Sequence, residues 1–132
     1  MKNARNQYNK APSVFRSLYN QEIDLNTCDP FWIHSRGKNI NINHCGLLLP
    51  IKKKPLPIEM NRVAVCCNWI LNFVEPSRKI IDKHSSYGLK HIVEEYYGDY
   101  IGNGEFIYAA ILLGYRFKQL GPNALFNMNF KK

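Results

Sequence analysis

The chain has 132 residues, of which 18 are lysine or arginine and 10 are aspartate or glutamate, so its net charge at pH 7 is +8. A chain of this length is expected to form a single domain around one hydrophobic core. No apolar run approaches the roughly 20 residues that cross a bilayer, and Met1–Pro12 has no signal peptide pattern, so we expect a soluble, cytoplasmic protein.

The positive charge is concentrated in the first half of the chain. Residues 1–66 contain ten basic and four acidic side chains, whereas residues 67–132 contain eight and six. We therefore expect an anionic partner to contact the amino-terminal half. The alternative is that the positive charge only keeps a small protein in solution.

The amino-terminal part is predicted to contain little regular structure. Residues 1–11 are polar, basic and aperiodic, which predicts a flexible arm. Pro12–Gln21 is predicted to be a short helix, because proline suits the first helical position and apolar residues follow at one-turn spacing. These apolar residues are Val14, Phe15, Leu18 and Tyr19.

The region 12–60 is predicted to be basic, irregular and partly β. Asn39–Asn43 alternates between asparagine and isoleucine, as a strand with one buried face does, and Leu47–Leu49 is its predicted hairpin partner. Arg36-Gly37-Lys38 is predicted to be a loop tip. Prolines surround Lys52–Lys54, which predicts an extended and exposed segment.

Residues 61–132 are predicted to form a helical core. Arg62–Glu75 follows a capping Asn61 and ends before a proline, and a basic linker is expected over Pro76–His84. Two further helices are predicted at Ser86–Tyr97 and Gly104–Leu113, each with a start signal and a terminal glycine. The start signals are Ser85 or Ser86 and the Asn103-Gly104-Glu105 triplet, and Gly98–Gly102 connects the two helices.

The helix at Gly104–Leu113 is predicted to be the buried centre of the domain. A recognition helix that reads DNA needs outward arginine, lysine, asparagine or glutamine, and Asn103–Leu113 has none beyond its predicted cap, Asn103. The apolar tail around Leu125 and Phe126 is expected to turn at Gly121-Pro122-Asn123 and fold back onto the core. The predicted fold is thus a single α+β domain over residues 1–132.

Metal and nucleophile patterns are weak. Histidines and cysteines are present, including His44-Cys45 and Cys66-Cys67, but no C-x-x-C pair gives the spacing of a structural zinc site. A cysteine nucleophile would need a histidine and an orienting group from elsewhere in the chain. We expect four reduced cysteines, no metal, no cofactor and no enzymatic activity, with a small cysteine- or histidine-dependent enzyme as an alternative.

Basic side chains interleaved with aromatic ones favour binding of a nucleic acid or of an acidic protein surface. Phosphate contacts of this kind give affinity without sequence specificity. The predicted binding residues are Arg36, Lys38, Lys52, Lys53, Lys54, Arg78, Lys79, Lys83 and Lys90.

The segment Ser85–Met128 contains the motifs SSYGLKH, NGEFI, AA, GY and PNA. On these motifs it resembles small uncharacterised accessory proteins of prophages and integrative elements in Gammaproteobacteria. The resemblance covers about a third of the chain and implies a genetic context rather than a site. Such proteins often regulate their element or blunt host defences, including CRISPR effectors.

We therefore expect a non-enzymatic binding protein of a mobile element that acts in the bacterial cytoplasm. Its preferred target is a host defence nucleoprotein complex of the CRISPR type, which it would inhibit through its basic surface. The alternative is a regulator of the element that binds nucleic acid directly.

Overall fold

A computed structural model describes residues 11–48 and 54–132 of the chain. Over these residues the predicted α+β class is confirmed, with three α-helices in the carboxy-terminal half and hairpin strands in the amino-terminal half. The predicted arm, apart from Ala11, lies outside the described residues, and so do Lys52 and Lys53.

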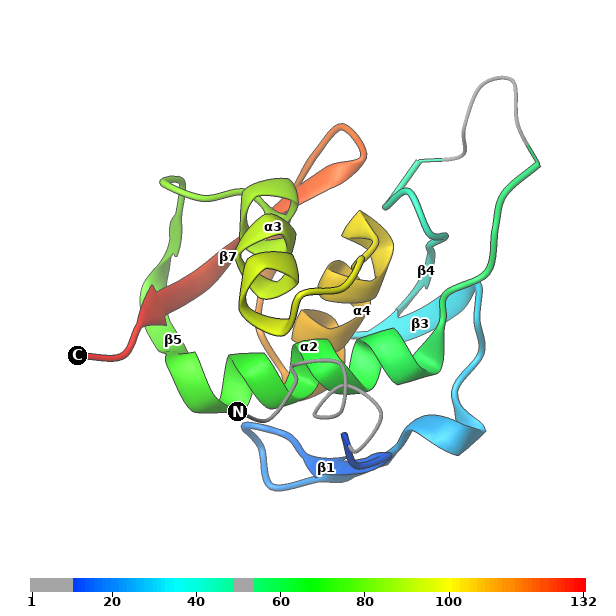
Figure 1. Ribbon diagram of the computed structural model, residues 1–132, viewed down its shortest axis with the longest axis horizontal. Coiled ribbons are helices and arrows are strands. Elements are labelled where there is room, and N and C mark those ends of the chain that lie inside the picture. Colours follow the sequence, from blue (N-terminus) through cyan, green and yellow to red (C-terminus); the bar gives the residue numbers. More distant parts are fainter. Residues whose placement is uncertain (1–10, 49–53) are drawn as a thin grey trace.

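Helix α4 (Asn103–Leu113) lies at the centre of the domain, and ten of its eleven residues are buried. Helices α2 (Met60–Phe73) and α3 (Ser86–Tyr97) pack against it (Figure 1). Phe106 and Ala110 have no exposed surface, and Ile111 retains only 5%. The prediction of a buried helix is therefore confirmed, as expected for a helix that is apolar on all sides.

Local signals define both ends of α3. The Ser85 hydroxyl accepts a hydrogen bond from the Gly88 amide at its start, and Gly98 adopts a left-handed conformation at its end. The predicted range Ser86–Tyr97 and the connection through Gly98–Gly102 are confirmed. The predicted capping role of Asn103 is wrong, because Gly102 is the cap residue and its amide donates to the Glu105 carboxylate at 2.9 Å.

Three antiparallel strands form the main sheet, in the order β5 (Val74–Ile81), β7 (Asn123–Phe130) and β6 (Phe117–Leu120). The tail therefore folds back, as predicted. The predicted linker at Pro76–His84 is wrong over most of its length, because the chain passes directly from α2 into β5. Pro76 is tolerated because β5 is an edge strand, and its register with β7 shifts between Pro76 and Ile81.

The predicted helix at Pro12–Gln21 is wrong. This segment forms β1 (Val14–Arg16), which turns at Ser17–Gln21 and pairs with β2 (Glu22–Asp24). Of the four apolar residues that suggested a helix, only Phe15 is buried. A single 3-10 turn, η1 (Leu25–Thr27), follows the hairpin.

A second hairpin pairs β3 (Trp32–Ser35) with β4 (Lys38–Asn41). The predicted loop tip is confirmed, because Arg36 and Gly37 join the strands with positive φ angles of 51° and 79°. The predicted pairing of this strand with Leu47–Leu49 is wrong for the two leucines that the structure describes, since β3 occupies that position.

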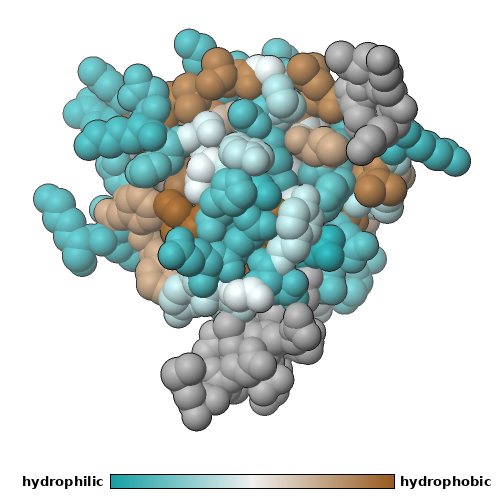
Figure 2. Space-filling model, turned by 45° about the horizontal axis from the view of Figure 1, so that its top comes forward, coloured by the Kyte–Doolittle hydropathy of each residue, from teal (hydrophilic) through white to brown (hydrophobic). Residues whose placement is uncertain are grey.

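Hydrophobic residues on the face shown in Figure 2 form separate patches among hydrophilic ones. Among the described helices, none is both long and apolar enough to cross a membrane.

Candidate anion-binding site

A cavity of about 690 Å³ lies between the β3–β4 hairpin, Leu47 and the strands β5 and β6. The folding of two distant parts of the chain creates it, because the hairpin supplies one wall and the carboxy-terminal sheet the other. Its lining includes three cationic side chains, those of Arg36, Lys38 and Arg116, and we call it the cationic cavity.

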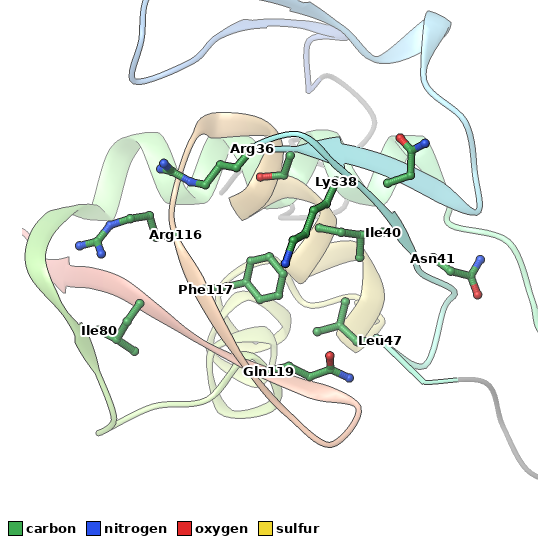
Figure 3. A pocket seen from close by; sticks show the side chains of 11 residues that line it. Arg36, Lys38, Ile40, Asn41, Leu47, Ile80, Arg116, Phe117 and Gln119 are labelled. Atoms are coloured by element: carbon green, nitrogen blue, oxygen red, sulfur yellow. The ribbon is translucent and has the colours of Figure 1, made fainter.

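Each of these three cations is placed by regular structure. Arg36 extends from the hairpin tip, where its guanidinium donates to the Tyr19 hydroxyl at 3.2 Å. Arg116 precedes β6 and donates to the Arg78 carbonyl at 2.6 Å. In Figure 3, Arg36 and Arg116 lie on the same side of the cavity, and Lys38 extends toward the Phe117 ring. The three charges therefore border one space.

Among the described residues, no acidic side chain lines the cationic cavity. All ten acidic residues of the chain lie in the described ranges, and the ion pairs found there involve only His44, Lys90 and His91. Arg36, Lys38 and Arg116 are also exposed. Their charges are therefore available to an external anion, which they would attract without first breaking an ion pair.

The remaining lining combines apolar and amide side chains. Ile40, Leu47, Ile80 and Phe117 supply apolar surface, and Asn39, Asn41 and Gln119 supply hydrogen-bonding groups. Phosphate esters of sugars and nucleosides carry both an anionic and an apolar part. A cavity with cations, amides and an aromatic ring suits such a ligand.

The structure divides the predicted binding residues into groups. Arg36 and Lys38 line the cationic cavity, and the Arg78 carbonyl holds Arg116 beside it. Lys54, Lys79 and Lys83 are exposed but do not line it. Lys52 and Lys53 lie outside the described residues.

Lys90 differs from the other predicted residues because it is only 5% exposed. Its ammonium lies 3.4 Å from the Glu94 carboxylate and close to the rings of Tyr87 and Tyr100. This charge is already neutralised within the protein, so Lys90 is not part of the cationic cavity.

The sequence does not identify Arg116 as a binding residue. The residues after Gly114 alternate at Tyr115 and Phe117, which is typical of a strand but does not show which side chains will face a cavity. The contact between Arg116 and Arg78 depends on how β5, β7 and β6 pair, which no local pattern in either segment specifies.

Within residues 11–48 and 54–132, no group of three histidine, cysteine, aspartate or glutamate side chains could hold a metal ion. Comparison with known proteins found no matching family model, no matching curated protein and no matching solved structure. The resemblance to prophage accessory proteins therefore stays a prediction, and the cavity itself is the basis for a function.

Proposed function

We propose that this protein binds a phosphate-bearing polyanion through Arg36, Lys38 and Arg116. The observation that carries the proposal is the cationic cavity, in which three exposed cations surround about 690 Å³ and no acidic side chain of the described residues opposes them. A nucleic-acid backbone presents phosphates to such a surface in any sequence, so binding would depend little on base identity.

The preferred partner is a host defence nucleoprotein complex of the CRISPR type, which the protein would inhibit in the bacterial cytoplasm by binding to it. A complex of this kind carries RNA or DNA whose backbone fits the chemistry of the cationic cavity. The alternative is a regulator of the mobile element that binds DNA directly. Both functions need the same three cations, so one binding assay tests their shared basis.

The assay measures fluorescence anisotropy of a labelled single-stranded oligonucleotide at increasing salt. Three phosphate contacts on a single strand give a slope of roughly −2 for log K against log salt, so affinity should fall roughly twentyfold between 50 and 200 mM salt. The variant with Arg36, Lys38 and Arg116 all changed to glutamine should lose most of this dependence. Absence of binding by the wild-type protein at 50 mM salt would reject the proposal.

A pull-down from the bacterial host separates the two partners. An inhibitor should retain one defence complex after nuclease treatment, and the triple glutamine variant should retain less of it. A regulator should retain only DNA, and nuclease should remove it. If the triple variant retains as much of either partner as the wild type, the cationic cavity is not the binding site.

A further inference from the structure

A second cavity, of about 430 Å³, lies beside the cationic one. The Leu47 amide donates to the Pro122 carbonyl at 2.9 Å, and Leu47 lines the cationic cavity whereas Pro122 lines the second one. The two cavities therefore adjoin across this hydrogen bond. We call the second space the tyrosine cavity, because Tyr87 and Tyr100 line it.

The walls of the tyrosine cavity come from four separate stretches that hydrogen bonds hold together. The Ser86 hydroxyl donates to the Asn103 amide oxygen at 2.7 Å and accepts from the Ala124 amide at 3.0 Å. The Asn103 amide nitrogen donates to the Asn123 side-chain oxygen at 2.9 Å and to the Cys45 carbonyl at 3.0 Å. These bonds fix the helix starts of α3 and α4 against β7 and the loop before α2.

Three hydrogen-bonded side chains, those of Glu105, His44 and Tyr100, extend from the core to this cavity. Glu105 is fully buried, and its carboxylate accepts hydrogen bonds from the amides of Gly102 at 2.9 Å and Glu59 at 3.2 Å. His44 Nδ1 lies 3.2 and 3.3 Å from the two carboxylate oxygens, and His44 Nε2 lies 2.8 Å from the Tyr100 hydroxyl. The carboxylate thus orients the imidazole toward Tyr100.

The partners of His44 assign its tautomer. A carboxylate only accepts hydrogen bonds, so the nitrogen that faces Glu105 carries the proton and the other nitrogen is left as a base. Burial raises the pKa of Glu105, whereas His44 and the two backbone amides favour its ionised form. Burial, and then the charge of Glu105, raises the pKa of Tyr100. The phenol therefore keeps its proton at neutral pH and needs a base in order to react.

We infer that Tyr100 is a nucleophile, with His44 as its general base and Glu105 as the residue that positions His44, in a site for phosphodiester transfer. In many enzymes that use covalent catalysis, the nucleophile is hydrogen-bonded to a general base, and a third group orients that base. This inference rests on the proposed function, because the polyanion bound in the cationic cavity supplies the phosphodiester.

The reaction conserves atoms and charge. The Tyr100 oxygen attacks phosphorus and forms an O–P bond while its proton passes to His44 Nε2. The bond from phosphorus to the leaving oxygen breaks, and His44 returns the proton to that oxygen. Water then attacks the phosphotyrosine by the same route, which releases Tyr100 and completes a hydrolysis.

Two cationic side chains lie beside the ring of Tyr100. The Lys90 ammonium lies 4.9 Å from the centre of the Tyr100 ring, and the Arg62 guanidinium carbon lies 5.3 Å from it. Glu94 holds Lys90 in place at 3.4 Å. Because Glu94 offsets the charge of Lys90, the Arg62 guanidinium beside the Tyr100 ring is the positive group that would stabilise the negative charge that develops on the phosphoryl oxygens.

The test uses bis(4-nitrophenyl) phosphate, an activated phosphodiester, with the full-length protein. The expected result is release of 4-nitrophenolate together with a covalent phosphoryl adduct that peptide mass mapping places on Tyr100. Tyr100→Phe keeps the ring and should abolish the adduct, and His44→Asn should slow its formation by roughly 100-fold or more. Tyr96→Phe removes an exposed hydroxyl outside the cavity and should change nothing.

Absence of an adduct from the wild-type protein, or its location on Cys45 or Tyr87, would overturn the inference. Oligonucleotide affinity of Tyr100→Phe separates this outcome from failure of the proposed function. If the wild type and this variant bind the oligonucleotide equally but no adduct forms, only the catalytic inference is rejected. If the wild type does not bind it at all, the proposed function is rejected as well.

Discussion

Gly104, the second residue of α4, has no room for a side chain. A Cβ atom there would overlap the Asn43 carbonyl oxygen and approach the Ile58 side chain at 2.9 Å. The Gly104 amide also donates to the His44 carbonyl at 3.0 Å, so the helix start cannot easily move away. The close approach of α4 to this loop, which places Glu105 beside His44, thus requires glycine.

Gly104→Ala is expected to destabilise the protein by about 1–3 kcal/mol, because the overlap forces the backbone apart. Gly88→Ala is the matched control, since a Cβ atom at Gly88 would meet no other atom within 4 Å and alanine favours a helix by up to about 1 kcal/mol. Urea denaturation of both variants measures the difference. Equal stability of Gly104→Ala and the wild type would contradict the close approach of α4 to the Asn43 carbonyl.

The four cysteines are free and differ in their environments. Cys45 is exposed, whereas Cys66 and Cys67 have no exposed surface. Burial raises the pKa of the thiols of Cys66 and Cys67, and also that of the partly buried Cys28. Cys66 and Cys67 therefore pack as small hydrophobic side chains in the core.

Thiol titration with a disulfide reagent at pH 8 should find one fast group in the native protein. Only the thiolate reacts, and a raised pKa leaves less thiolate at this pH, so Cys28 should react more slowly than Cys45. Cys66 and Cys67 should react only after unfolding in denaturant. Four fast groups in the native protein would show that the helix α2 is not packed as described.

At the scale of elements, Asn103 holds three segments together. Its amide nitrogen donates to the Cys45 carbonyl, the Pro122 carbonyl and the Asn123 side chain, and its oxygen accepts from Ser86. It thus joins the loop before α2, the β6–β7 turn and the start of α3. A shorter side chain cannot replace this set of contacts.

Asn103→Ala should destabilise the protein by about 2–4 kcal/mol, because buried polar groups lose their partners. Asn103→Asp has the same size but turns an oxygen toward three acceptors, so its cost should be at least as large. Thermal unfolding of both variants at neutral pH provides the measurement. A melting temperature unchanged in Asn103→Asp would mean that size alone matters at this position.

The sequence predicts the elements whose signals are local. Both ends of helix α3 are predictable, because Ser85 and Gly98 act within one turn of the helix they limit. The segment Val14–Tyr19 has spacing that fits a helix, yet its outcome depends on distant contacts such as the bond from the Leu18 amide to the Leu113 carbonyl. Local sequence signals do not predict strand β5 for the same reason, because its partner β7 lies far along the chain. Val74 of β5 lies opposite Phe130 of β7.

The same distinction applies to the candidate sites. Arg36 and Lys38 are predictable together because they flank one hairpin tip, whereas Arg116 joins them only through the sheet. Glu105 is an acid at a helix start, as the sequence predicts, but its contact with His44 depends on packing across 61 positions of sequence. The sequence shows which residue types are present, but it does not show which of them lie close together in the fold.

At the scale of the whole molecule, the net charge of +8 does not by itself show which cations can bind a partner. Two of the three cations in the cavity come from the amino-terminal half, where the partner is predicted to bind, while Arg116 comes from the other half. Lys38 on β4 and Lys118 on β6 form a natural comparison. Both are exposed lysines on hairpin strands, but only Lys38 lines the cationic cavity.

The most direct measurement is therefore the salt dependence of oligonucleotide affinity for Lys38→Glu and Lys118→Glu beside the wild type. Each variant changes the net charge by the same amount, so a general charge effect would weaken both equally. We predict that Lys38→Glu lowers the magnitude of the slope by roughly 0.7, the value of one single-strand phosphate contact, while Lys118→Glu leaves it unchanged. Equal slopes for the two variants would contradict the assignment of the cationic cavity as the binding site.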